Sequence, residues 1–419
     1  MKRSLRAALA VLLALSSVPA FAEKPNIKLG QLALHPYYSI KATYDDNIYL
    51  VPKDDRSGQV GGGVRHSWIM TNTLGLGAEL PVGEMHKLKA AYEVRSDVYS
   101  RQSSANNAFT QKADGSYDFK GARSKANVFD SYLNTQDPQF NPNNTAVAGE
   151  LTTRKRRWQN TVGASAEYFL GEKFFFGVDA QNTVQKYLDT TYAAQLNRSE
   201  GQAGVKTGYK IQPKTRVYVS GHRAVTHYSA GKSLDHASNH HDWLLNGGVE
   251  GEFTAKLKGQ IQSGMSYRKH DTDDSKNLTR AQIKTVTRNW IVSVGLQYKP
   301  TENDTVKLKA NRAVNDAITG GNYYITNGAT LDMAHKMNKV TVGAAGGVQI
   351  DKYSETTTVG GVTANRRDDT YSGSANVAYD IQDWLAVKAD YTHQARFSIF
   401  SHQYNYRDNK TSLELKVSF

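Results

Sequence analysis

The chain has 419 residues, a formal net charge of +13 and no cysteine, so it offers no disulfides and no thiol chemistry. Its mean hydropathy is −0.58, and no segment after the N-terminus approaches the ~20 consecutive apolar residues that a membrane helix needs. A membrane β-barrel stays compatible with these values, because only every second residue of each strand faces lipid.

The N-terminus has the parts of a secretory signal peptide. Three basic residues precede a short apolar run, and Ala20-Phe21-Ala22 follows as a cleavage site. We therefore expect residues 1–22 to be a signal peptide, residues 23–35 to be a short periplasmic segment, and residues 36–419 to form one folded domain.

The rest of the chain is dominated by alternation of polar and apolar residues, which is typical of strands with one wet face. Trp290 and Val292, for example, alternate with Asn289 and Ser293. We expect 18 strands, near residues 36–48, 65–80, 86–100, 106–118, 123–135, 155–169, 173–187, 200–211, 214–228, 241–254, 257–270, 285–299, 304–318, 321–334, 339–353, 369–381, 384–398 and 405–419. The alternation is weak over 106–135, and the count falls to 16 if that segment is one long loop.

The connections between these strands alternate in length. Gly171-Glu172 and Gln212-Pro213 are short, whereas Gln136–Thr153 and Tyr353–Asp368 are long and polar. Short periplasmic turns and longer extracellular loops are typical of outer-membrane barrels. We therefore predict an all-β fold, a single transmembrane antiparallel up-and-down β-barrel in the bacterial outer membrane.

The last strand supports this prediction. Residues 412–419 alternate polar and apolar positions and end on an aromatic residue. Such a strand closes an outer-membrane barrel, and we expect Leu415, Val417 and Phe419 to form the signal that the barrel-assembly machinery reads. A soluble periplasmic β-protein that happens to end on Phe is the alternative.

Several short motifs follow one another in a familiar order. They are Tyr44-Asp45-Asp46-Asn47-Ile48-Tyr49, then Trp68 and Leu74, then Lys87–Tyr92, Tyr117-Asp118-Phe119 and Asp130-Ser131-Tyr132. This order resembles the outer-membrane β-barrel porin family of the second type, which is associated with exopolysaccharide gene clusters, most closely over residues 35–190. The resemblance implies a barrel that passes a surface polysaccharide and works with periplasmic polysaccharide-export proteins. It brings no catalytic residue.

Twelve basic residues face the lumen on the expected strand phasing. They are Lys87, Lys89, Arg95, Lys206, Lys210, Lys258, Arg268, Lys307, Lys309, Lys339, Lys388 and Lys416. Rings of positive charge in a confined channel favour anions, so we expect an acidic polysaccharide as cargo. Acids such as Glu93, Asp179 and Glu250 share the same face, and a salt-bridged lumen that only keeps the barrel open is the alternative.

A second basic cluster lies at the expected extracellular rim. It consists of Arg154, Lys155, Arg156 and Arg157, and it is a candidate contact for lipopolysaccharide, because guanidinium groups pair with phosphate oxygens. A solvated rim is the alternative. Nucleic acid is not expected as a partner of a secreted chain.

Two groups of residues are weak candidates for metal binding. His236, His240 and His241 fall around one expected loop, but adjacent residues of a strand point to opposite faces. Asp45-Asp46-Asn47 offers oxygen ligands for calcium, although a polar turn is the preferred interpretation. We expect no metal and no cofactor.

Enzyme motifs do not occur in the chain: it has no G-x-S-x-G, no H-E-x-x-H and no phosphate loop. We therefore expect no enzymatic activity, and three functions stay open. The first is a channel that assists export of an exopolysaccharide. The second is a general or anion-selective diffusion porin, which an inward-folded loop at Gln136–Thr153 would favour. The third is a non-conducting structural or adhesive barrel.

Overall fold

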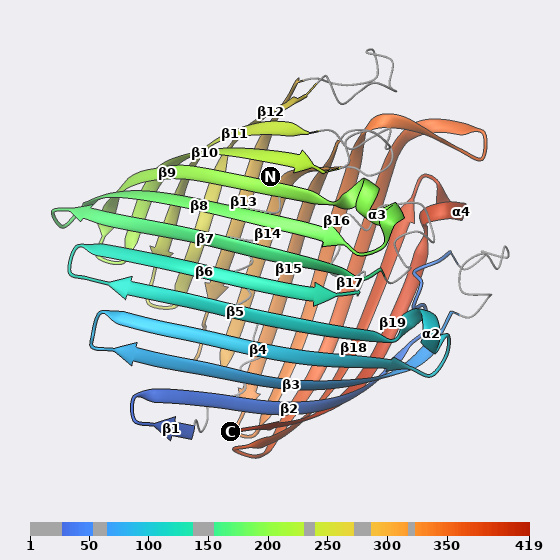
Figure 1. The fold of residues 1–419 in the computed structure, drawn as a ribbon, viewed down its shortest axis with the longest axis horizontal. Helices are drawn as coiled ribbons and strands as arrows, with labels where there is room; N and C mark the ends of the chain where they lie inside the picture. Colours follow the sequence, from blue (N-terminus) through green and yellow to red (C-terminus); the bar gives the residue numbers. More distant parts are fainter. Residues whose placement is uncertain (1–26, 53–64, 137–154, 230–238, 272–285, 317–322) are drawn as a thin grey trace.

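The computed structural model describes residues 27–52, 65–136, 155–229, 239–271, 286–316 and 323–419. Its strands form one antiparallel sheet in which β19 (Tyr406–Ser418) pairs with β2 (Leu32–Asp45), so the strands β2 to β19 close into an 18-stranded barrel (Figure 1). The predicted fold class and strand number are confirmed.

The bounds of the other elements follow. The strands are β1 (Ile27–Leu29), β3 (Ser67–Val82), β4 (His86–Tyr99), β5 (Ala108–Lys120), β6 (Ser124–Thr135), β7 (Arg157–Leu170), β8 (Phe174–Tyr187), β9 (Arg198–Gln212), β10 (Thr215–Tyr228), β11 (His240–Glu252), β12 (Leu257–His270), β13 (Val286–Tyr298), β14 (Asp304–Asp316), β15 (Tyr323–Met337), β16 (Val340–Val359), β17 (Val362–Gln382) and β18 (Leu385–Ser398). The helices in the described residues are α2 (Ser103–Asn106), α3 (Thr190–Leu196) and α4 (Ser401–Tyr404). None of the helices placed by the structure is long and apolar enough to cross a membrane.

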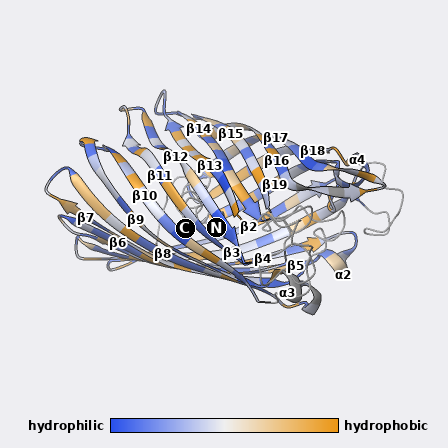
Figure 2. Cartoon of the chain, turned by 90° about the horizontal axis from the view of Figure 1, so that it is seen from above, coloured by the Kyte–Doolittle hydropathy of each residue, from blue (hydrophilic) through white to orange (hydrophobic). Residues whose placement is uncertain are grey.

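The barrel has the inverse burial pattern of a soluble protein. Leu245 is 67% exposed and Trp68 is 58% exposed, whereas Arg268 is 1% exposed. Figure 2 shows hydrophobic and hydrophilic positions alternating along the strands. Because successive side chains of a strand point to opposite faces, this alternation places apolar side chains against lipid and polar ones inside the barrel.

The segment with weak alternation forms two strands. Residues 106–135 contain β5 and β6, which pair with each other and with β4 and β7. The weak pattern arises because the outer face of β5 carries Gln111, Ala113 and Gly115, so few large apolar side chains mark that face. The strand count is therefore 18, and the alternative of 16 is wrong.

The two ends of the barrel differ in their connections. Pro213-Lys214 joins β9 to β10, and Asn338-Lys339 joins β15 to β16, at one end. The other end carries α2, α3 and α4, together with longer connections such as residues 46–66. This difference assigns the first end, here called the turn end, to the periplasm and the second, the loop end, to the cell exterior.

One predicted loop is a β-hairpin. Residues 353–368, expected as a long extracellular loop, continue β16 and β17 beyond the neighbouring strands and turn at Gly360-Gly361 (Figure 1, orange). Both glycines have positive φ, 58° and 82°, which suits a tight hairpin turn. The threonines and valines beside them favour strand structure. The predicted loop Gln136–Thr153 lies, apart from Gln136, outside the described residues.

The start of the chain also enters the sheet. Residues 27–29 pair with residues 32–34, and the turn between them contains Gly30 at a φ of 64°. Part of the segment that the sequence assigns to a periplasmic N-terminal stretch therefore forms β1 and the beginning of β2.

The C-terminal residue lies at the closing seam of the barrel. The Phe419 amide donates to the Pro36 carbonyl (3.0 Å), and its ring stacks on Trp384 with the centroids 6.2 Å apart. Leu415 and Val417 pair across the seam with Ile40 and Tyr38. Their role as an assembly signal remains a prediction.

Deletion of Phe419 is expected to reduce the yield of folded barrel in the outer membrane. The deletion removes the ring stack and one hydrogen bond at the seam, together worth about 1–2 kcal/mol. The measurement is the fraction of heat-modifiable protein on a gel. Phe397→Ala is the control, because Phe397 pairs with Tyr371 away from the seam. Equal yields for the two variants would contradict a special role of the C-terminal residue.

Candidate functional site: the inner wall of the barrel

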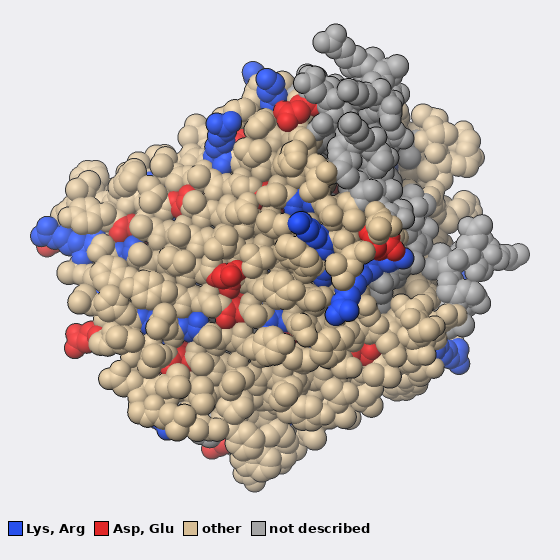
Figure 3. Space-filling view, in the orientation of Figure 1, with Lys and Arg blue, Asp and Glu red and all other residues tan. Residues whose placement is uncertain are grey.

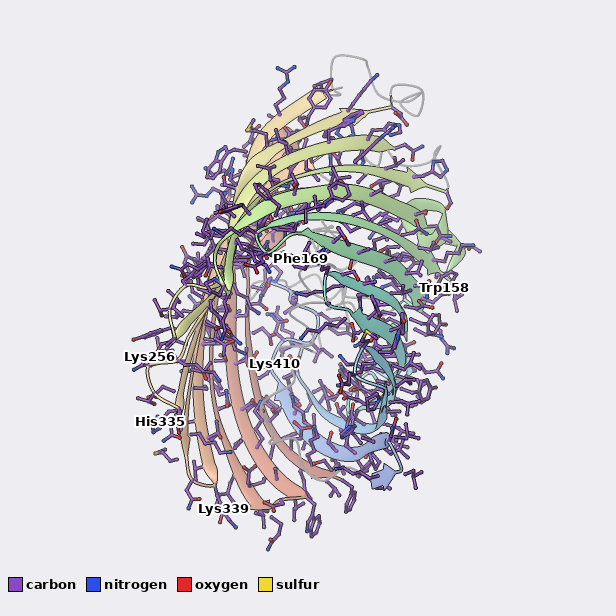
Figure 4. The ribbon with its side chains drawn as sticks, turned by 90° about the vertical axis from the view of Figure 1, so that its left-hand side faces the viewer. Trp158, Phe169, Lys256, His335, Lys339 and Lys410 are labelled. Atoms are coloured by element: carbon purple, nitrogen blue, oxygen red, sulfur yellow. The ribbon has the colours of Figure 1, made fainter. Side chains whose placement is uncertain are left out.

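Eleven of the twelve predicted basic residues lie on the inner face of their strands. They share that face with buried polar residues; Lys206, for example, pairs with Ser220, which is 4% exposed. Lys339 is the exception, and its prediction is wrong. It lies in the turn before β16, where its Nζ donates to the Ile381 carbonyl (3.2 Å; Figure 4). The strand begins one residue later than expected, so Lys339 is outside the alternating pattern.

Six of the inner residues are held in ion pairs. Lys89 lies 3.2 Å from Asp118, and Lys206 lies 2.8 Å from Glu250. The same applies to Lys87, Arg95, Arg268 and Lys388. The inner wall therefore carries charges of mixed sign, and its basic residues are not all available to a cargo.

Three inner lysines differ from these. In the part of the chain that the structure describes, no carboxylate forms an ion pair with Lys210, Lys258 or Lys309. Lys210 lies two residues before the end of β9, Lys258 is the second residue of β12, and Lys309 is the sixth of β14. All three positions lie in the half of the barrel nearer the turn end. The positive charge that a cargo can meet is therefore concentrated toward the periplasmic side.

Aromatic rings accompany the lysines on one side of the barrel. Phe169, Phe175 and Tyr218 form a cluster of buried residues contributed by β7, β8 and β10. The Lys206 ammonium lies 3.8 Å from the centroid of Tyr218, and the Lys210 ammonium lies 4.2 Å from that of Phe169. Cations are attracted to the faces of aromatic rings.

Arg216 completes this group. Its guanidinium carbon lies 4.2 Å from the centroid of Phe175. Phe169, Phe175, Lys206, Lys210, Arg216 and Tyr218 are together called the basic–aromatic wall. Figure 4 looks along the barrel from the turn end and shows Phe169 on the inner side of the sheet, with Trp158 on the outer side.

A glycine permits the close packing of this wall. A Cβ atom at Gly208 would lie 2.1 Å from the Val217 carbonyl oxygen and 2.7 Å from the Phe175 ring. Only glycine leaves room for the ring at this point of β9.

Two carboxylates balance part of the positive charge of the wall. Arg216 donates two hydrogen bonds of 2.8 Å to Glu167, and its Nε donates to Glu250. Glu250 also accepts from Lys206. Lys210, in contrast, forms no ion pair with a carboxylate among the described residues. It can therefore bind an anionic group without first breaking an ion pair.

The inner wall near the loop end is built from buried arginine–carboxylate pairs. Arg366 donates to Asp368, and both side chains are 1% exposed. Arg198 and Glu200 are paired in the same way, whereas the Arg95 side chain that pairs with the buried Asp97 is 29% exposed. Removal of one partner from a buried ion pair is costly, so these residues hold each other in place and are less suited to cargo exchange.

Arg198 and Arg366 were not predicted as inner-wall residues, although their sequence context carries a signal. The segments Arg95-Ser96-Asp97, Arg198-Ser199-Glu200 and Arg366-Arg367-Asp368 each place a base and an acid two residues apart. In a strand these side chains lie on one face, within reach of each other. The spacing alone therefore indicates an ion pair along the strand.

The basic cluster at the rim is divided among several environments. Arg154 lies outside the described residues. Lys155 lies 2.9 Å from Asp189, and Arg156 is exposed and donates to Asn134 (3.4 Å). Arg157 faces inward and is 3% exposed, so its prediction as a rim contact is wrong. Alternation along β7 sends neighbouring residues to opposite faces of the sheet.

The candidate metal ligands have other partners. His236 lies outside the described residues, and His240 and His241 point to opposite faces of β11. Oxygen atoms of Asp45, Asp46 and Asp408 lie within 4.8 Å of one another. The Lys410 ammonium stands 3.0 Å from Asp45 and 3.3 Å from Asp408 and supplies positive charge to this group. Asn47 caps the turn by donating to the Val51 and Arg407 carbonyls.

Comparison with known protein families decides the class of the molecule. The sequence matches the family described as putative beta-barrel porin 2 over residues 23–419. The chain belongs to this porin family. The match extends well beyond residues 35–190, where the resemblance in the sequence was closest. The protein is thus an outer-membrane β-barrel with the character of a porin-like channel.

Solved structures resemble this porin in fold alone. A mutant of the ferric enterobactin receptor (PfeA) from Pseudomonas aeruginosa has 8% identity and a TM-score of 0.42, over 92% of this chain and 80% of that one. The siderophore receptor PirA from Pseudomonas aeruginosa has 8% identity and a TM-score of 0.43, over 94% and 81%. The FrpB iron transporter from Neisseria meningitidis has 8% identity and a TM-score of 0.45, over 98% and 83%. No curated protein has significant sequence similarity to the chain.

Proposed function

We propose that this porin assists export of an acidic exopolysaccharide across the outer membrane. The observation that carries the proposal is the position of Lys210 against Phe169 in the basic–aromatic wall, 4.2 Å from the ring centroid. Lys210, Lys258 and Lys309 all lie in the periplasmic half of the inner wall. Among the described residues, no carboxylate forms an ion pair with any of them. An acidic chain that enters from the periplasm meets these cations first.

The chemistry of the wall suits a sliding polymer. Lysine ammonium groups attract carboxylate or sulfate groups at long range and release them easily, because they bind as point charges and not as rigid forks. Aromatic faces offer a flat apolar surface to sugar rings. Conduction requires binding that is strong enough for entry and weak enough for exit, which several weak sites provide better than one strong site.

Partners on the periplasmic side follow from the same proposal. Periplasmic polysaccharide-export proteins would deliver the chain to the turn end, where the connections are short and leave the mouth accessible. The barrel-assembly machinery is the second proposed partner, through Leu415, Val417 and Phe419.

An anion-selective diffusion porin is the second candidate function. The ion pairs of six predicted basic residues favour it, because a wall of mixed charge also suits the passage of small solutes. The two functions differ in the size of the cargo, since only an export channel must pass a long chain.

Release from liposomes separates these candidates. Vesicles that contain the refolded barrel are loaded with an acidic oligosaccharide of about ten sugars, or with a neutral dextran of equal length. The export proposal predicts release of the acidic chain at a rate about tenfold higher than that of dextran, equivalent to about 1.4 kcal/mol. Retention of both chains, with release of small anions alone, would support the diffusion porin. Retention of all solutes would support a non-conducting barrel.

A further inference from the structure

A groove lies on the lipid-facing side of the barrel, across β9 to β13. It has a volume of about 750 Å³. Its exposed apolar lining includes Val205, Leu245 and Met265, which are 51%, 67% and 52% exposed. These residues alternate along their strands with inward, buried positions. The groove therefore opens to the membrane and is separate from the inner wall.

One row of side chains crosses the groove from strand to strand. Arg223 pairs with Trp243, Trp243 pairs with Tyr267, and Tyr267 pairs with Arg288 in the strand register. The Arg223 guanidinium lies 5.7 Å from the Trp243 ring, and the Arg288 guanidinium lies 5.6 Å from the Tyr267 ring. Adjacent strands are about 4.8 Å apart, so the backbones of the two arginines are about 14 Å apart.

These arginines have unused hydrogen-bonding capacity. Within the described ranges, no carboxylate forms an ion pair with Arg223 or Arg288. A guanidinium that stacks on a ring keeps its N–H groups free at its edge, and those groups fit phosphate oxygens. The row therefore presents two anchoring points for phosphate on a surface that is otherwise apolar.

The next row toward the periplasm forms the hollow floor of the groove. Gly221 pairs with Leu245, Leu245 with Met265, and Met265 with Trp290. Gly221 has no side chain between Val205 and Leu245, and the atom nearest to a Cβ placed there is 4.0 Å away, so the floor of the groove is open at this point. Charged groups thus lie above apolar ones, in the same order as in a lipid of the outer leaflet.

The level of the row in the membrane fits this order. Trp243 is the fourth residue of β11 and Arg288 the third of β13, both counted from the loop end. Aromatic residues at this height form the girdle at the membrane interface, where lipid-facing charges are tolerated. Arg312 of β14 lies 4.4 Å from the centroid of Trp290, and its register partner Val292 is four residues closer to the periplasm than Arg288. Figure 3 shows the face formed by strands such as β3 to β9 as a mostly uncharged surface on which basic and acidic atoms are scattered.

We propose that this groove binds the phosphorylated lipid anchor of lipopolysaccharide. The two arginines hold the two phosphates of the anchor, and an acyl chain occupies the hollow at Gly221. This site is distinct from the rim cluster of residues 154–157 and does not depend on the cargo of the channel.

Native mass spectrometry of the detergent-solubilised barrel with diphosphorylated lipid A tests the proposal. The variant Arg223→Gln/Arg288→Gln should bind about tenfold more weakly than the wild-type protein. The control variant Arg123→Gln/Lys214→Gln, which changes exposed positions at the turn end, should bind like wild type. Equal affinities of the wild-type protein and the groove variant for lipid A would overturn the proposal.

Two further sets of binding measurements identify the ligand and control for misfolding of the arginine variant. Gly221→Leu fills the hollow while it keeps both arginines, and it should also weaken binding of lipid A. Lipid A without phosphates should bind wild type and the arginine variant equally weakly. If inorganic pyrophosphate binds wild type as tightly as lipid A does, the groove recognises free phosphate and the lipid proposal fails.

Discussion

Replacement of Lys210, Lys258 and Lys309 by glutamate is expected to turn an anion-preferring channel into a cation-preferring one. The three changes reverse the charge of inner residues that no described carboxylate neutralises, all in the periplasmic half of the barrel. We expect the ratio of anion to cation permeability to fall by about tenfold, which corresponds to about 1.4 kcal/mol. The measurement is the reversal potential across a planar bilayer with a gradient of potassium chloride.

Salt concentration and a matched variant provide the controls for this experiment. The effect should be large at 0.1 M salt and small at 1 M, because the screening length falls from about 10 Å to about 3 Å. Lys173→Glu/Lys214→Glu/Lys299→Glu changes the same charge in solvated turns and should alter the ratio less than twofold. An unchanged ratio in the inner variant would show that these lysines do not face the conducting path.

The second large effect is expected from loss of a buried arginine. Arg268 is 1% exposed, donates to Asp242 (2.8 Å) and contacts Asp316. Arg268→Gln leaves two carboxylates without their partner, and removal of one member of a buried ion pair costs about 3–5 kcal/mol. We expect this loss in the free energy of unfolding, measured by urea titration of the barrel in lipid vesicles.

An exposed ion pair of the same barrel serves as the control for the buried Arg268 network. Arg367 lies 2.8 Å from Asp369, and its side chain is 48% exposed. Arg367→Gln should cost less than about 1 kcal/mol, because solvent screens such pairs. Arg268→Lys keeps the charge and should fall between the two. Equal losses for Arg268→Gln and Arg367→Gln would mean that the buried network does not stabilise the barrel.

Alternation and connection length were sufficient to predict the barrel, because a membrane strand must separate its two faces completely. The same rule explains the errors. A shift of one residue at the start of β16 removed Lys339 from the inner face, and alternation in β7 turned Arg157 inward. The hairpin at Gly360-Gly361 was not predicted, because its polar segment was interpreted as a loop. Two glycines between β-branched residues nevertheless favour a tight turn.

The site was predictable only in part. The inner face of each strand follows from period two, but the partners of each lysine depend on the register between strands. Lys206, Tyr218 and Glu250 come from three strands, and no spacing along the chain indicates that they meet. The room that Gly208 leaves for Phe175 is equally invisible in the sequence. Ion pairs within one strand, such as Arg366 and Asp368, were in contrast accessible from their spacing.

Single-channel conductance with an acidic polysaccharide fragment tests the central claim most directly. The refolded barrel is inserted into a planar bilayer, and an acidic fragment or a neutral fragment of equal length is added. We expect anion-preferring current steps that the acidic fragment interrupts. The variant Phe169→Ala/Lys210→Gln removes a contact of the basic–aromatic wall and should show fewer interruptions. Steps that are indifferent to the acidic fragment would contradict the export function and leave a diffusion porin.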